Sequence, residues 1–131
     1  MNHILVKPHD KKLTLQDCFD IAWKWSRNHP KCCDVFGKCY YRNEDNTNAC
    51  LIGICIPDEK YYGSKVAIIQ LFGIYPEVRK IFVHNIGVKA LERLQRCHDG
   101  ASISNYLKSV TKNLVEFAKD YNLTIPEEKK I

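Results

Sequence analysis

The sequence lacks several features that would assign it to a functional class at once. No stretch approaches the roughly 20 consecutive apolar residues of a membrane-spanning helix, and the longest apolar run covers only residues 49–56. The six glycines never form a G-x-G-x-x-G or G-K-[ST] phosphate-binding pattern. The first residues carry neither a long apolar stretch nor a small-residue cleavage site. We therefore expect no membrane span, no nucleotide-binding loop of these types and no export by a signal peptide.

Cysteine, by contrast, is abundant, with seven residues in a chain of 131. An odd number with irregular spacing favours free, mostly buried thiols in a reducing compartment such as the cytoplasm. The net charge of +5 arises from 20 basic and 15 acidic residues scattered along the chain. Scattered charge of this size favours solubility and an acidic partner more than nucleic-acid binding.

The length and the 45% apolar content predict one domain, residues 1–131, with loose ends at about 1–12 and 126–131. Thr14 and Asp17 resemble a capping box at the start of a helix that runs to about His29. Apolar periodicity predicts a helix over 88–98 and a longer one from about Ile103, capped by Ser102 or Ser104. Shorter helices are expected over 64–72 and 76–83.

Residues 38–42 suit a short strand, and the polar residues 43–48 suit a turn. The apolar run 49–56 fits either a buried strand or a short buried helix, and we favour the helix. The predicted fold is therefore a mainly α, single compact α+β domain with five or six helices and room for a short β-hairpin.

The sequence offers residues for two kinds of reactive site. Cys39, Cys50, Cys55 and His98 are zinc-type ligands, but their spacing does not match the short knuckles of structural zinc sites. A Cys-His-Asp nucleophile using His98 and Asp99 lacks a nucleophile elbow or a glycine-rich oxyanion loop. We therefore predict no metal, no cofactor and no catalytic residues.

The aromatic residues offer a different signal, because they occur in close pairs at 23 and 25, 40 and 41, and 61 and 62. Members of such pairs cannot all face one core, and exposed tyrosine and tryptophan are common in protein-binding surfaces. Packing at the rim of a thin core is the structural alternative.

Three segments occur in a recognisable order: C-x-Y-R at 39–42, a segment from Cys50 to Tyr61 containing I-P-D-E-x-Y, and L-Q-x-x-H-D at 94–99. Together with Y-x-L at 121–123, they resemble a group of small uncharacterised proteins encoded by bacteriophages and prophages. The resemblance spans about residues 14–125. The chain departs from the group at Leu51, where alanine is usual, and in its longer cysteine-rich stretch before Cys39.

The resemblance implies a phage or prophage origin and action in the cytoplasm of the bacterial host. By analogy with small phage proteins that lack catalytic motifs, it implies an accessory factor that binds a host protein or complex and modulates or inhibits it. Inhibitors of host defence, for example of the anti-CRISPR kind, belong to this class. The candidate contact residues are Trp25, Tyr41, Arg42, Tyr61 and Tyr62.

A second hypothesis is a small enzyme or ligand-binding domain with a polar pocket. Its residues would be Arg42, Cys50, Asp58, His98 and Asp99. Convergence of these side chains on a cleft would favour a pocket, whereas an internal Arg42 ion pair would favour a structural role. A third hypothesis is nucleic-acid binding through a basic stripe formed by Lys108, Lys112 and Lys119.

Overall fold

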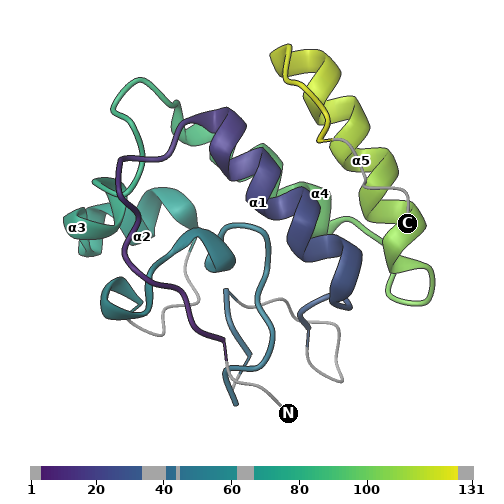
Figure 1. Ribbon diagram of the computed structural model, residues 1–131, viewed down its shortest axis with the longest axis horizontal. Helices are drawn as coiled ribbons and strands as arrows, with labels where there is room; N and C mark the ends of the chain where they lie inside the picture. The colour runs from purple at the N-terminus through teal and green to yellow at the C-terminus, as the bar shows by residue number, and fades with distance from the viewer. Residues whose placement is uncertain (1–3, 34–40, 44, 62–66, 127–131) are drawn as a thin grey trace.

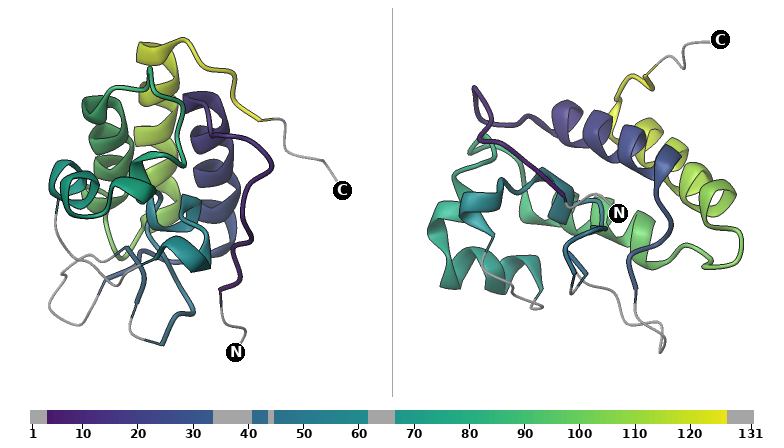
Figure 2. Two further views of the ribbon diagram at one scale, coloured as in Figure 1. Left: turned by 90° about the vertical axis from the view of Figure 1, so that its left-hand side faces the viewer. Right: turned by 60° about the horizontal axis from the view of Figure 1, so that its bottom comes forward.

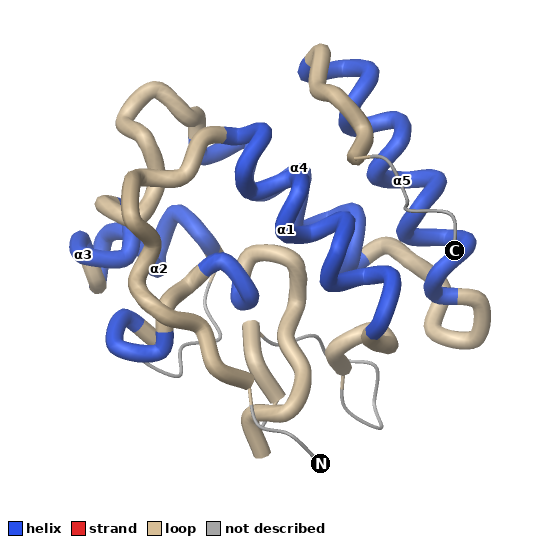
Figure 3. The backbone as a smooth tube through the Cα atoms, viewed as in Figure 1, coloured by secondary structure: helices blue, strands red, loops and turns tan. Residues whose placement is uncertain are grey.

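The computed structural model describes residues 4–33, 41–43, 45–61 and 67–126. Helices α1, α4 and α5 lie side by side, and the shorter elements gather beside them (Figures 1 and 2). The described elements are α1 (Leu15–Asn28), the 3-10 helices η1 (Gly53–Cys55) and η2 (Asp58–Lys60), α2 (Ile68–Ile74), α3 (Pro76–Arg79), α4 (Val88–Asp99) and α5 (Tyr106–Tyr121). The predicted mainly helical class is confirmed, because the described residues form helices and loops with only isolated β-bridges (Figure 3). None of the described helices has both the length and the apolar character needed to cross a bilayer.

Helix α1 begins at the predicted capping box. The Asp17 amide donates to the Thr14 hydroxyl at 3.1 Å, and the Thr14 amide donates to the Asp17 carboxylate at 3.0 Å. The helix ends at Asn28, where the following extended residue leads into Pro30. Its apolar side packs on α5, where the rings of Phe19 and Phe117 stack with centroids 6.1 Å apart.

Helix α4 matches the predicted span of 88–98 within one residue, but α5 starts three residues later than predicted. Ser102 and Ser104 serve the turn between the two helices instead of capping α5. The Ser102 amide donates to the Ser109 hydroxyl, and the hydroxyl groups of Ser102 and Ser104 are hydrogen-bonded to each other. Ile103 consequently lies outside the helix and is 60% exposed.

The apolar run 49–56 forms neither the eight-residue helix that we favoured nor a strand. Among the described residues, the predicted hairpin is represented by one antiparallel bridge between Arg42 and Ala49, and the run then turns into η1. Residues 38–40 of the predicted strand lie outside the described part. A Cβ atom on Gly53 would lie 1.8 Å from the carbonyl oxygen of Tyr41, so this approach requires glycine. The run is buried throughout, which explains why its sequence carries no helical or strand period.

The predicted helix over 76–83 is also too long, because α3 ends at Arg79. The chain then leaves the helix so that Phe82 forms a parallel bridge with Leu13. The Arg79 guanidinium stabilises the segment after α3 by donating to four backbone carbonyl groups, those of Phe82, Val83, His84 and Ile86. For the segment predicted at 64–72, the described helix is α2, and residues 64–66 lie outside the described part.

The N-terminal segment is attached to the domain from residue 4 onward, contrary to the prediction of a loose end. The Ile4 amide donates to the Asn46 carbonyl at 2.7 Å, and the Asp58 amide donates to the Val6 carbonyl at 2.9 Å. At the other end of the segment, the Leu13 amide donates to the Ile81 carbonyl at 2.8 Å. Hydrogen bonds to residues this distant in sequence cannot be anticipated from local patterns.

Candidate functional site

The Arg42 cluster is the first of two hydrogen-bonded groups among the predicted pocket residues. The Arg42 side chain is 2% exposed and forms an ion pair with Asp58 at 2.8 Å. The same guanidinium donates to the Ile56 carbonyl at 2.7 Å and lies 4.6 Å from the centroid of the Tyr61 ring. Asp58 is 37% exposed and also accepts the Val6 amide at 3.2 Å. This ion pair therefore joins the bridge at Arg42, the η2 region and the N-terminal segment.

The His98 cluster is the second group. The Cys32 amide donates to Nε2 of the fully buried His98 at 2.9 Å, and Nδ1 lies 2.8 Å from the Asp99 carboxylate. Because an amide nitrogen can only donate, the Nε2 atom is the acceptor, and the ring proton resides on Nδ1 facing Asp99. Gln95 donates to the same carboxylate and accepts the Ile52 amide at 3.1 Å. These contacts fasten the C-terminal end of α4 to two loops.

The Cys50 thiol, the remaining pocket candidate, is fully buried and accepts the Gly53 amide at 3.3 Å. Burial raises the pKa of Cys50 far above the ordinary thiol range. The nucleophilic form of cysteine is the thiolate, so this environment opposes the chemistry of a reactive thiol. Among the described residues, no set of three or more His, Cys, Asp or Glu side chains is placed to hold a metal ion. Cys39, one of the four zinc-type ligands named above, lies outside the described part.

Four of the five predicted pocket residues thus come together in two pairs, Arg42 with Asp58 and His98 with Asp99, whereas Cys50 joins neither pair. Each pair is engaged with backbone groups of the same domain. Four surface hollows bounded by described residues are lined by other side chains.

The predicted contact residues are more buried than expected. Tyr41 is 8% and Arg42 is 5% exposed, so the expectation that these two face outward is wrong. Trp25 and Tyr61 are half-buried. The Trp25 indole stacks on His29 and donates to the Ala49 carbonyl at 3.0 Å. Tyr62 lies outside the described residues, and the role of Trp25 and Tyr61 as partner contacts stays a prediction.

The predicted basic stripe on α5 is interrupted by acidic side chains. Lys108, Lys112 and Lys119 are all exposed on this helix. Glu116 lies between the second and third lysine and is exposed as well, and Asp120 forms an ion pair with Arg93. The mixed charge weakens the case for a phosphate-tracking surface on this helix.

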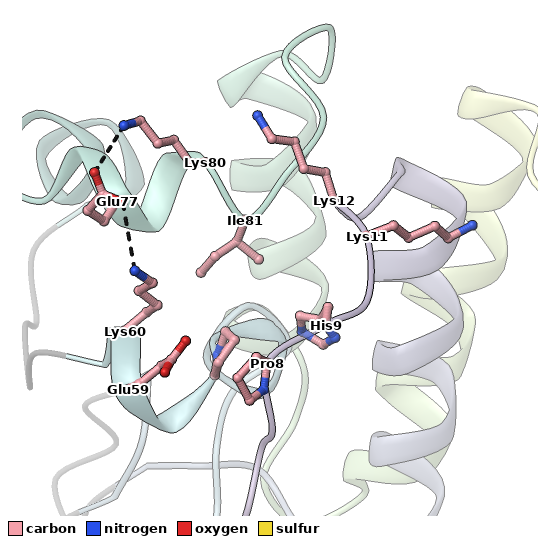
Figure 4. Close-up of a pocket in the computed structure, with 10 residues that line it drawn as sticks. Pro8, His9, Lys11, Lys12, Glu59, Lys60, Glu77, Lys80 and Ile81 are labelled. Atoms are coloured by element: carbon pink, nitrogen blue, oxygen red, sulfur yellow. Dashed lines mark hydrogen bonds and ion pairs between the residues drawn. The ribbon is translucent and has the colours of Figure 1, made fainter.

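Sequence inspection missed a hollow of about 180 Å³ between the N-terminal segment, η2 and α3 (Figure 4). Lysines from three separate segments line this lysine hollow together with two glutamates and an apolar floor. The lining residues are Pro8, His9, Lys11, Lys12, Pro57, Glu59, Lys60, Glu77, Lys80 and Ile81. Their charges are scattered along the sequence, so only the folded chain brings them together.

Glu77 lies on one side of the lysine hollow and forms ion pairs with two lysines. Its carboxylate lies 3.0 Å from the Lys80 ammonium and 3.7 Å from that of Lys60. The hydrogen bond and charge of Lys80, followed by the charge of Lys60, hold the pKa of Glu77 below its usual range. Lys12 has no ion-pair partner in the described part of the chain. The hollow therefore has more ammonium groups than carboxylates to neutralise them.

Comparison of the chain with family models, with curated proteins and with solved structures finds no match.

Proposed function

We propose that this protein is a phage-type accessory factor that binds a host protein or complex in the bacterial cytoplasm and modulates or inhibits it. The support comes from the use to which the fold puts its distinctive side chains. Arg42, His98 and Asp99 belong to the segments that resemble the phage group, and each makes hydrogen bonds to other groups of the domain, Asp99 from an exposed position. Those segments therefore act as the framework of the fold, which leaves the outer surface to carry the function.

The observation that carries this proposal is the occupation of both His98 ring nitrogens. A histidine that acts as a general base needs a free nitrogen within reach of a substrate proton. Here Nδ1 faces Asp99 and Nε2 accepts the Cys32 amide, in a fully buried position. The thiol of Cys50 is equally enclosed. Binding through exposed residues is thus better supported than catalysis by this set.

Affinity capture with the tagged chain from a lysate of its bacterial host tests the proposal. We expect one host protein to be retained in a fixed ratio, and the purified pair to bind saturably and to change the activity of the host protein. A tagged domain of unrelated sequence and equal net charge controls for non-specific retention. Failure of the chain to retain any protein beyond this control, at low and at physiological salt, would contradict the proposal.

Trp25→Ala and Tyr61→Ala variants test the two predicted contact residues that keep an exposed surface. Loss of the captured protein, with an unchanged circular dichroism spectrum and melting temperature, would assign the contact. Unchanged capture by both variants would place the contact elsewhere on the surface.

A further inference from the structure

We infer that the lysine hollow is a docking surface for an acidic segment of a protein partner, which inserts a carboxylate side chain between Lys12 and Lys80. This inference rests on the proposed function and names the surface and the partner chemistry. It concerns residues that lie outside the Arg42 and His98 clusters.

The arrangement of the side chains supports a receptor for a single charged group. Ile81 is surrounded by four charged side chains, those of Lys12, Lys60, Lys80 and Glu59 (Figure 4). The side chain of Lys11 points away from Ile81, toward α1. Pro8 and Pro57 complete an apolar floor on which the methylene groups of an incoming Glu side chain can pack. The volume of about 180 Å³ is below the roughly 300 Å³ at which pockets for drug-sized ligands begin. A side chain fits this space better than a whole metabolite.

The excess of lysines over carboxylates in the lysine hollow favours an anionic ligand. One carboxylate, that of Glu77, is shared between Lys60 and Lys80, and the Lys12 ammonium has no described partner. An added carboxylate near Lys12 and Lys80 would supply the missing counter-charge. Lys12 and Lys80 are both exposed to solvent. We therefore expect their attraction for the carboxylate of the partner to weaken with salt and to affect mainly the association rate.

The two glutamates favour a protein over a nucleic acid as the source of the anion. Glu59 is exposed and has no ion-pair partner among the described residues, and Glu77 lies in the same hollow. A phosphate backbone carries charge of one sign at regular intervals and would meet both carboxylates. A protein segment can place an acidic side chain at Lys12 and a basic one at Glu59.

The walls of the hollow are fixed before any partner arrives. The Asp58 amide donates to the Val6 carbonyl, the Leu13 amide donates to the Ile81 carbonyl, and His9 Nε2 lies 2.8 Å from the Cys55 carbonyl oxygen. These contacts tie the N-terminal segment to the η1 and α3 regions on either side of the hollow. Preorganised walls reduce the ordering cost of binding.

A charge-reversal pair with a matched control tests the inference. The hollow variant is Lys12→Glu/Lys80→Glu, and the control is Lys24→Glu/Lys89→Glu, which changes two exposed lysines on α1 and α4. Both variants change the net charge equally. The partner captured by the wild-type chain is purified, and its Kd for each variant is measured at 50 and 200 mM salt.

We expect the hollow variant to raise Kd at low salt by at least about tenfold and the control to change it less than about twofold. Equal Kd values for the wild-type chain and both variants would overturn the docking surface while leaving the proposed function intact. Equal losses in both variants would also overturn it, because net charge alone would then account for binding. Capture of nothing by the wild-type chain would overturn the proposed function and the inference with it.

Two further measurements distinguish docking at the hollow from loss of fold and from nucleic-acid binding. Circular dichroism and thermal melting of the variants exclude loss of fold, which is not expected because Lys12 and Lys80 are exposed. Titration with a 20-nucleotide single-stranded RNA and its DNA equivalent tests the other class of polyanion. Tight, salt-sensitive binding of either strand that only the hollow variant loses would assign the hollow to nucleic acid and overturn the protein partner.

Discussion

Two regions of this protein use positively charged side chains in opposite ways. In the Arg42 cluster, a guanidinium with 2% exposure holds together the bridge, the η2 region and the N-terminal segment. In the lysine hollow, Lys80 keeps 65% of its side chain exposed and shares Glu77 with Lys60. Removing a buried cation from water is costly unless it is paired, and the Arg42 guanidinium is paired through its two terminal nitrogens, whereas an exposed ammonium remains available for exchange. The first region is thus suited to stabilising the fold, and the second has the exposed charge that the proposed docking surface needs.

The largest loss of stability is expected at Gly53, where the fold leaves no room for a side chain. Gly53→Ala places a Cβ atom 1.8 Å from the Tyr41 carbonyl oxygen, so the backbone beside the Arg42 cluster has to move. We expect a loss of about 3 kcal/mol or more in the free energy of unfolding, measured by urea denaturation. Gly73→Ala in α2 is the control, because its Cβ meets nothing within 4 Å, and helix propensity predicts equal or greater stability. Equal effects of the two changes would show that the close approach at Gly53 is not required.

A matched pair of carboxylate changes compares the two regions directly. Asp58→Asn removes the counter-charge of a buried guanidinium, and we expect it to cost about 2 kcal/mol in urea denaturation. Glu77→Gln removes the exposed partner of Lys60 and Lys80, and we expect no measurable loss of stability but a few-fold tighter capture of the acidic partner. A larger stability loss for Glu77→Gln than for Asp58→Asn would reverse the assignment of the two regions.

His98→Phe tests whether the His98 cluster belongs with the framework. Phenylalanine keeps a ring of similar shape next to Tyr106, but it leaves the Cys32 amide without its acceptor. Loss of this buried hydrogen bond predicts a loss of about 1 to 2 kcal/mol in the free energy of unfolding. The same substitution at the exposed His84 should leave stability unchanged. If the His98→Phe variant kept wild-type stability but lost a biochemical activity, that result would support the pocket hypothesis.

Alkaline pH should lower the stability of the domain through its buried thiols. Burial raises the pKa of Cys97 to about 11. A raised folded-state pKa means that the unfolded chain loses the thiol proton first. The stabilising contribution is therefore complete below the ordinary thiol range near 8.5 and is lost as the pH rises toward 11. We expect Cys97 to account for about 2 kcal/mol by pH 10, seen as a smaller alkaline decline in urea midpoint for Cys97→Ala than for the wild-type chain.

Much of the fold could be predicted because its signals are local. The Thr14 and Asp17 capping box acts over three residues, and the apolar periodicity of α4 follows from helix geometry alone. The start of α5 was misplaced because Ser102 and Ser104 are equally suited to a cap or to a turn. The run 49–56 was misassigned because burial on every side removes the period on which such assignments depend.

The candidate sites divide in the same way. The sequence alone determined which residues were polar in the distinctive segments, but only the tertiary structure paired Arg42 with Asp58 and enclosed His98. Likewise, nothing in the spacing of residues 12, 60 and 80 indicates that their side chains share one hollow. They meet because hydrogen bonds between distant backbone segments bring the N-terminal segment alongside α3. Helix caps and periods depend on neighbours along the chain, whereas burial and charge clustering depend on neighbours in space, which only the complete fold supplies.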